Sequence, residues 1–160
     1  MKAELGEFIS FLEKYRDELV VALDNEREKR QALISNDIDR LEALIQAQQA
    51  ETMKLKNFEN KRLALQTKLG LGNCKAKDIV AAAGDKETKE RLETLLDEIV
   101  SLVGRIKQQN KMAIELANTN LRVIDKIIRP ADTEARNVYG PENSKNNPVY
   151  SIEPSFEKMV

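Results

Sequence analysis

A single uninterrupted heptad row most constrains what this chain can fold into. Mostly apolar residues recur at alternating steps of three and four from Leu92 to Ile127, and the row ends at Arg129-Pro130. Because 3.5 residues is close to one helical turn, this spacing places every member on one side of a long α-helix, which must bury that side against other helices. The members are Leu92, Leu95, Ile99, Leu102, Ile106, Gln109, Ala113, Leu116, Asn120, Val123 and Ile127.

Composition and periodicity together predict an all-α fold. Charged residues make up 33% of the chain and aromatic residues only 4%, which is typical of long amphipathic helices rather than sheets. We expect an antiparallel bundle of three long, coiled-coil-like helices with a short connector helix and an extended C-terminal tail. The expected ranges are 1–130 for the bundle, about 3–34, 38–69 and 86–129 for its helices, 70–85 for the connector and 131–160 for the tail.

Short signals mark the expected helix ends. Asn36 is the predicted N-cap of the second helix, Gly70 fits the position that ends it, and Asp85 caps the third. The apolar row of the first helix runs onto Glu26 and Lys29. Either that helix drifts to a 3.6-residue frame there, or its end lies outside the main core.

Charge and residue content exclude several function classes. Net charge is −1, with 26 basic and 27 acidic residues mixed along the same segments, so no basic face suited to nucleic acid stands out. The chain has no histidine, the commonest metal ligand and general base at neutral pH. Cys74 has no histidine to activate it. We therefore expect a protein without enzymatic activity, metal or other cofactor.

The sequence also predicts a cytoplasmic protein. No apolar run approaches the roughly 20 residues that span a bilayer, so membrane insertion is not expected. The first seven residues carry acidic side chains and lack the apolar core of a signal peptide. A single cysteine, Cys74, cannot form an internal disulfide, which is compatible with a reducing compartment.

The third helix should be longer than the helices that can cover it. At 1.5 Å per residue it extends about 65 Å, whereas each of the other two extends about 48 Å. A partner helix therefore ends about ten residues before the third helix does. We expect the remaining stretch to bind another protein. Its candidate residues are Leu116, Asn120, Leu121, Val123, Ile124, Ile127 and Ile128.

Polar residues near this stretch leave two function classes open. Gln109, Asn110, Asn118 and Asn120 make this part of the helix less tightly specified, which favours a surface that exchanges partners. One hypothesis is therefore a protein that is monomeric, or a weak homodimer, when free and that forms a specific complex with a partner protein. The alternative is a structural coiled-coil protein that self-associates permanently through the same row, and a signalling adaptor is a weaker third possibility.

Several landmarks of the chain together resemble a known family. In order they are Ser35-Asn36-Asp37 between two long helices, Leu69-Gly70-Leu71-Gly72, Gln109-Asn110 on the third helix, Pro130 after it, and Val138-Tyr139-Gly140-Pro141-Glu142 in the tail. The chain resembles the FlgN-type flagellar export chaperones over about residues 5–143. One departure is Asn143, where the family often has glycine.

The resemblance implies partners and sites. It implies a chaperone of the secreted hook–filament junction proteins that needs neither nucleotide nor metal. By the resemblance, the C-terminal part of the third helix, about 116–128, binds the export substrate, and the length difference singles out the same stretch. The resemblance also implies docking on the flagellar export gate through the tail tyrosine, which would be Tyr139, next to Gly140.

Overall fold

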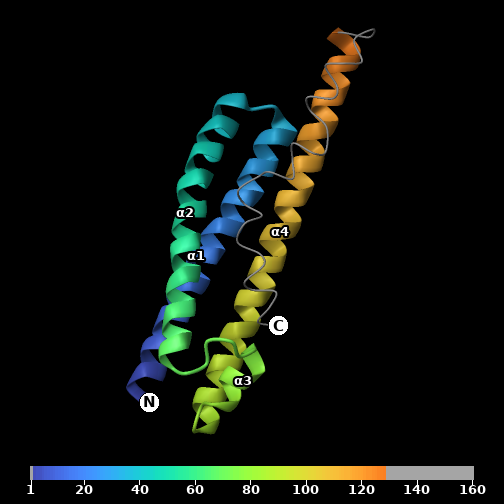
Figure 1. The fold of residues 1–160 in the computed structure, drawn as a ribbon. Helices are drawn as coiled ribbons and strands as arrows, with labels where there is room; N and C mark the ends of the chain where they lie inside the picture. The colour runs from blue at the N-terminus through green and yellow to red at the C-terminus, as the bar shows by residue number, and fades with distance from the viewer. Residues whose placement is uncertain (1, 129–160) are drawn as a thin grey trace.

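The computed structural model describes residues 2–128, which form four α-helices (Figure 1). No strand occurs among these residues, so the predicted all-α class is confirmed for them. The tail expected at 131–160 lies outside the described residues. The helices are α1 (Lys2–Ser35), α2 (Ile38–Lys68), α3 (Ala76–Ala81) and α4 (Lys86–Ile128).

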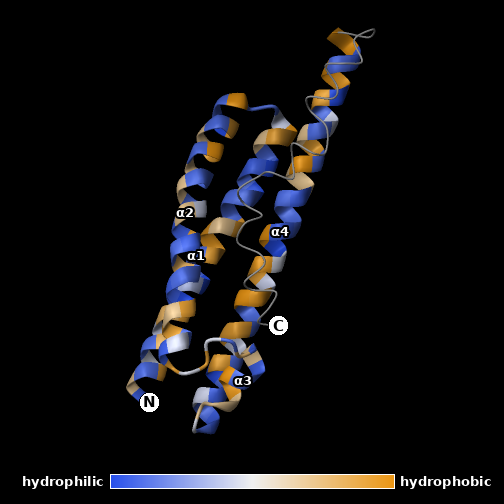
Figure 2. Cartoon of the chain, viewed as in Figure 1, coloured by the Kyte–Doolittle hydropathy of each residue, from blue (hydrophilic) through white to orange (hydrophobic). Residues whose placement is uncertain are grey.

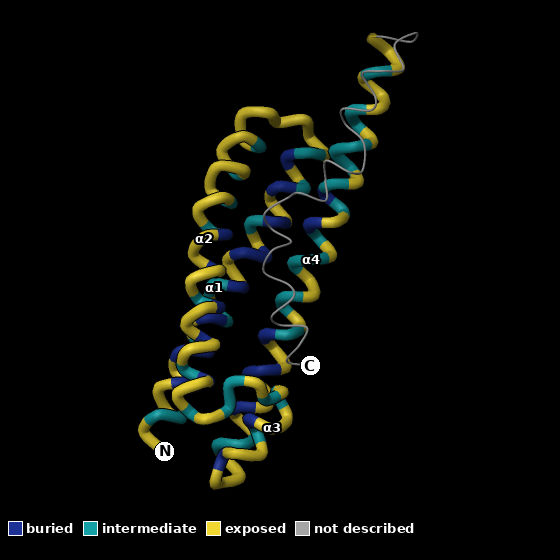
Figure 3. The backbone as a smooth tube through the Cα atoms, viewed as in Figure 1, coloured by how far each residue is buried: buried dark blue, intermediate teal, exposed yellow. Residues whose placement is uncertain are grey.

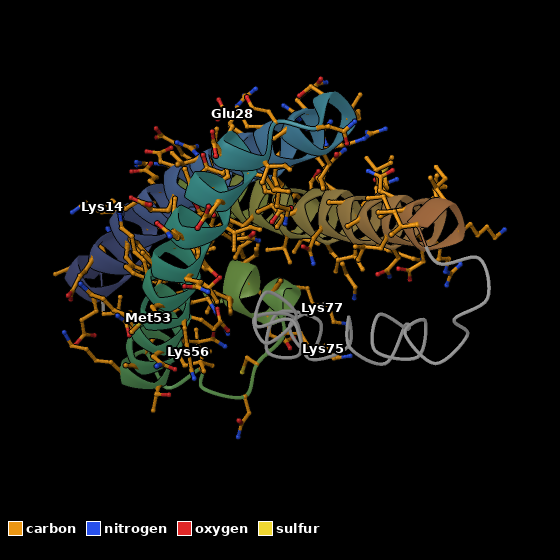
Figure 4. All side chains as sticks on the ribbon, turned by 90° about the horizontal axis from the view of Figure 1, so that it is seen from above. Lys14, Glu28, Met53, Lys56, Lys75 and Lys77 are labelled. Carbon is orange, nitrogen blue, oxygen red and sulfur yellow. The ribbon has the colours of Figure 1, made fainter. Side chains whose placement is uncertain are left out.

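The long helices are arranged around α1. Helices α1 and α2 form an antiparallel hairpin, and α4 runs beside α1 in the same direction (Figure 1). Helix α1 packs extensively against both α2 and α4, whereas α2 and α4 contact each other only sparsely. In the view from above, α2 and α4 occupy different sides of the molecule and α1 adjoins both (Figure 4). The short helix α3 packs on α4.

The turn between α1 and α2 corrects one predicted cap. Asp37, not Asn36, is the N-cap of α2, and its Oδ1 accepts a hydrogen bond from the backbone N–H of Arg40 at 3.1 Å. Asn36 instead has a left-handed backbone with φ of 54°. Asparagine tolerates this conformation better than most residues, so Asn36 makes the turn and Asp37 caps the helix.

The other predicted helix ends agree with the structure. Gly70 follows the C-cap residue Leu69 with φ of 74°, the left-handed conformation that ends many helices. Asp85 caps α4, because its Oδ2 accepts a hydrogen bond from the backbone N–H of Thr88 at 2.8 Å. This bond, together with one from the Thr88 hydroxyl, lowers the pKa of the Asp85 carboxyl.

The main core fills the half of the hairpin nearest the N-terminus. Apolar side chains of α1, α2, α3 and α4 meet there, and the rings of Phe11 and Tyr15 each stack on Phe58 with centroids 5.6 Å apart. Along this part of α4, apolar residues alternate with polar ones in Figure 2, and buried residues alternate with exposed ones in Figure 3. The buried members are Phe8, Ile9, Phe11, Leu12, Tyr15, Leu19, Ala22, Leu55, Ile79, Leu92, Leu95, Leu96 and Ile99.

A buried polar network closes this end of the hairpin. The guanidinium of Arg62, 1% exposed, donates to both carboxylate oxygens of Glu59 and to Gln66. The amide of Gln66 donates to the backbone carbonyls of Leu71 and Cys74, which ties the connector to α2. Each buried charge therefore has a partner, as burial in a low-dielectric interior requires.

Helices of the described range are amphipathic rather than uniformly apolar. Within residues 2–128, none combines the length and the apolar character needed to cross a membrane.

Candidate functional site

The C-terminal end of α4 projects beyond the hairpin and presents aliphatic side chains to solvent. Figure 1 shows α4 continuing past the connection between α1 and α2. In Figure 3 this part of α4 is exposed or intermediate, without the buried segments of the other end. The exposed fractions are 50% for Val123, 48% for Ile124, 74% for Ile127 and 68% for Ile128. A chain exposes such a group of large apolar side chains at interaction surfaces.

The structure places the predicted binding residues along this end of one helix. Leu116, Asn120 and Leu121 are half-buried, and the four residues from Val123 onward are exposed. The exposed end begins at about residue 122, so the covered part of α4 extends somewhat further than the length estimate alone suggests. The two predicted gate-docking residues, Tyr139 and Gly140, lie outside the described residues.

A groove lies directly beside this projecting end. It has a volume of about 260 Å³ and separates α2 from α4, with α1 between them as its floor. Leu41 and Ile45 of α2 form one wall, and Ile114 and Ala117 of α4 form the other. Ile45 is 44% exposed, although a side chain of this type is usually buried. The full lining is Lys29, Leu33, Leu41, Ile45, Gln48, Gln49, Thr52, Ala113, Ile114 and Ala117.

The apolar row of α4 differs from the predicted one in its second half. Asn110 is fully buried, whereas Gln109 is only half-buried. A straight α-helix has 3.6 residues per turn and drifts about 20° per heptad from a 3.5-residue row. Over the roughly two and a half heptads from Leu92 to Asn110 the drift is about 50°, half the 100° between neighbouring residues, which is enough for Asn110 to be buried in place of Gln109. The row that borders the groove and continues along the projecting end is Ile114, Ala117, Leu121, Ile124 and Ile128.

A buried polar layer closes the groove at its inner end. The ammonium of Lys29 lies 2.8 Å from a carboxylate oxygen of Glu26 and donates to Gln48 at 3.0 Å and to Asn110 at 3.1 Å. The amide of Gln48 donates back to Glu26 at 2.5 Å. Burial raises the pKa of the Glu26 carboxyl, and the charge of Lys29 opposes that rise. The layer therefore joins α1, α2 and α4 through one cation.

The polar layer shows where Glu26 and Lys29, the two charged residues in the apolar row of α1, lie in the structure. Glu26 and Lys29 are 3% and 7% exposed, so they keep their place in the apolar row and are buried as an ion pair. The expected drift of the frame does not occur at these positions, but the other expectation is confirmed, because the main core includes no residue of α1 beyond Ala22 and the end of this helix lies outside it. The cation that pairs with Glu26 is Lys29, three residues further along the same helix.

Sequence reasoning did not find this layer, although a signal for it exists. Glu26 and Lys29 stand at heptad steps from the apolar residues of α1, and the buried residues of α2 share the same spacing. A polar residue in phase with an apolar row is a candidate for burial with a partner. The in-phase set of α2 is Ile38, Leu41, Ile45, Gln48, Thr52, Leu55, Glu59, Arg62, Gln66 and Leu69.

The surfaces that remain open at this site are suited to binding another helix. The charged groups of the polar layer are occupied by one another, and the surfaces that remain open are aliphatic. Across residues 2–128, no cluster of three or more potential metal ligands occurs. An aliphatic row at heptad spacing on an exposed helix is the kind of surface that receives another helix.

Comparison with known proteins gives one match. The family model described as FlgN protein matches residues 2–147 of the 160-residue chain. No curated protein and no solved structure matches the chain.

Proposed function

The chain belongs to the FlgN family of flagellar export chaperones, and on that basis we propose that its substrates are the unassembled hook–filament junction subunits. In this proposal the protein holds a subunit in the cytoplasm and delivers it to the flagellar export gate. The family match covers nine-tenths of the chain and supports the chaperone role.

The exposed aliphatic end of α4 is the observation that carries the proposal. Val123, Ile124, Ile127 and Ile128 form an apolar surface on a helix that no other described helix covers. In this proposal the unassembled subunit presents an apolar helical surface of its own to the chaperone. Pairing the two surfaces removes both from water, at about 25 cal/mol for each Å² of apolar area buried. Binding and release then require no chemical step on the chaperone.

Docking on the export gate is assigned to the tail. Tyr139 and Gly140 lie within the residues that the family model matches, and by resemblance they are the gate-docking residues. Substrate binding and gate docking would then use separate parts of the chain. A chaperone needs this separation, because it must hold the subunit while it contacts the gate.

Calorimetric titration with purified hook–filament junction subunits tests the proposal. Two shortened proteins identify the site: one ends after Arg129 and lacks only the tail, and the other ends after Ala117 and also lacks the projecting end of α4. We expect the first to bind like the full chain and the second not to bind. Absence of binding by the full, folded chain would refute the proposal.

The alternative of a permanent self-associating coiled coil has a separate measurement. The same aliphatic row could pair with a second copy, so sedimentation analysis of the free protein distinguishes the two functions. We expect a monomer, or a dimer that dissociates on dilution. A stable oligomer that persists on dilution and excludes the subunit would favour the structural function.

A further inference from the structure

We propose that an amphipathic helix of the export substrate lies in the groove between α2 and α4 as a fourth helix. In this arrangement Leu41 and Ile45 of α2 form a second wall of the substrate site, opposite α4. The inference rests on the proposed function of the α4 end and extends its site onto the hairpin. It assigns a binding role to aliphatic residues of α2 as well as to those of α4.

The open seam between α2 and α4 is the position that a fourth helix would take. Helix α1 packs against both neighbours, but α2 and α4 make few contacts with each other, so one side of the three-helix arrangement stays open. The groove in that seam is aliphatic on both walls, through Leu41 and Ile45 on one side and Ile114 and Ala117 on the other. Two aliphatic walls with a floor match the apolar stripe of a helix better than one exposed helix alone.

The groove and the projecting end of α4 form one continuous surface. Ile114 and Ala117 line the groove, and the same heptad row continues through Leu121, Ile124 and Ile128 beyond the hairpin. Heptad spacing of this kind packs against a partner with the same spacing, which is a helix. From Ile114 to Ile128 the row is about 21 Å long, so the occupant is a helix of about 14 residues.

The protein's own residues after α4 are poorly suited to be this occupant. All four prolines of the chain, Pro130, Pro141, Pro148 and Pro154, lie there. Proline is not tolerated in a helix interior, so the longest proline-free run between them, 131–140, gives at most about 15 Å of helix. That run also has few large apolar side chains. Because the FlgN family consists of export chaperones, the occupant we infer is a segment of a substrate.

The polar layer specifies part of the occupant's sequence. Lys29 and Gln48 close the inner end of the groove, and Gln49 stands on its α2 side. The rest of the lining is aliphatic over most of its length. The substrate helix should therefore carry aliphatic residues at heptad steps and one hydrogen-bonding side chain at the end that meets Gln49.

The test places a charge on the α2 wall of the full-length protein. Ile45→Glu puts a carboxylate in the groove, and Val21→Glu is a matched control on α1 outside the groove lining. The two side chains are 44% and 51% exposed, and glutamate is a good helix former, so both variants should keep the helical content of the wild type. We expect Ile45→Glu to weaken binding of a hook–filament junction subunit at least about tenfold and Val21→Glu to change it less than about twofold.

A second measurement keeps the test decisive if Ile45→Glu perturbs folding. A photo-crosslinking amino acid at position 45 of the full-length chain should form an adduct with the subunit, and the same group at position 21 should not. An adduct at position 45 with a second copy, or with residues 129–160 of the same chain, would overturn the inference.

The remaining outcomes separate this inference from the proposed function. If Ile124→Asp with Ile127→Asp abolishes binding while Ile45→Glu binds like the wild type, the groove is not part of the site but the proposed function stands. If the wild-type chain binds no junction subunit at all, both fail together.

Discussion

The buried cation of the polar layer provides the strongest test of the structure. Lys29→Met keeps an aliphatic side chain of similar length but removes the ammonium that contacts Glu26, Gln48 and Asn110. The carboxylate of Glu26, 3% exposed, is then left without its cation. Removing one partner of a buried ion pair typically costs about 3–5 kcal/mol, because the other charge stays buried without compensation.

The variant can limit this cost by protonating Glu26. From the ordinary pKa of 4.5, holding that carboxyl neutral at pH 7 costs about 3.4 kcal/mol at 1.36 kcal/mol per unit. The amide oxygens of Gln48 and Asn110 also lose a donor, which adds about 1 kcal/mol. We therefore expect Lys29→Met to lower the free energy of unfolding by about 4 kcal/mol at pH 7.

The same reasoning gives the direction in which the free energy of unfolding depends on pH. The pKa of Glu26 is raised by burial, so between 4.5 and that raised value the folded state binds more protons than the unfolded state. The contribution of the Glu26 carboxyl to the free energy of unfolding is therefore present at low pH and is lost as the pH rises. Without Lys29 the pKa of Glu26 rises further, so the stability loss in Lys29→Met should become smaller as the pH falls from 7 to 5.

Urea unfolding followed by far-ultraviolet circular dichroism measures these changes. Lys54→Met is the matched control, because Lys54 also lies 2.8 Å from a carboxylate, that of Glu18, but is 56% exposed. It should cost less than about 1 kcal/mol. The double variant Glu26→Gln with Lys29→Met removes both charges and should cost less than Lys29→Met alone. Equal losses for Lys29→Met and Lys54→Met would show that the layer is not a buried ion pair.

Three further predictions concern other parts of the chain. Ile124→Asp with Ile127→Asp should abolish subunit binding in calorimetry. It should change the free energy of unfolding by less than about 1 kcal/mol, because both side chains are largely exposed. A large stability loss would show that they belong to the core. Arg62→Met should cost about 3–5 kcal/mol in urea unfolding, since it leaves the carboxylate of Glu59 buried without its cation, and a neutral effect would contradict that arrangement. Tyr139→Ala should leave subunit affinity unchanged but lower export in a secretion assay, whereas reduced affinity would assign the tail to the substrate site.

Helices and their ends were accessible from sequence because they depend on local chemistry. The capping carboxylate of Asp85 and the left-handed Gly70 act within a few residues of their own position. The turn at Asn36 and Asp37 shows the limit of such reasoning, since both residues can cap a helix or adopt a left-handed turn. Only the packing of α1 on α2 decides which residue takes which role.

The partners of buried polar residues could not be predicted from the sequence, because they depend on contacts between distant residues. Lys29 meets Asn110 across 81 positions of sequence, and no local pattern of either residue specifies the other. The one-residue shift from Gln109 to Asn110 has a similar origin. It depends on how straight α4 is over several turns, because a small change in helical repeat decides which of the two neighbours is buried.

The position of the polar layer bears on how the proposed site works. On one side of the layer α4 is held by large aliphatic residues such as Leu96 and Ile99, and on the other its contacts are small ones such as Ala113 and Ala117. A buried ion pair stabilises little relative to an apolar core, although it disfavours other arrangements of the helices. Lys29 thus keeps the half of α4 that carries the proposed site in register. This half itself makes few large apolar contacts with the other helices. A substrate helix can therefore supply the missing aliphatic contacts and later leave without unfolding the core.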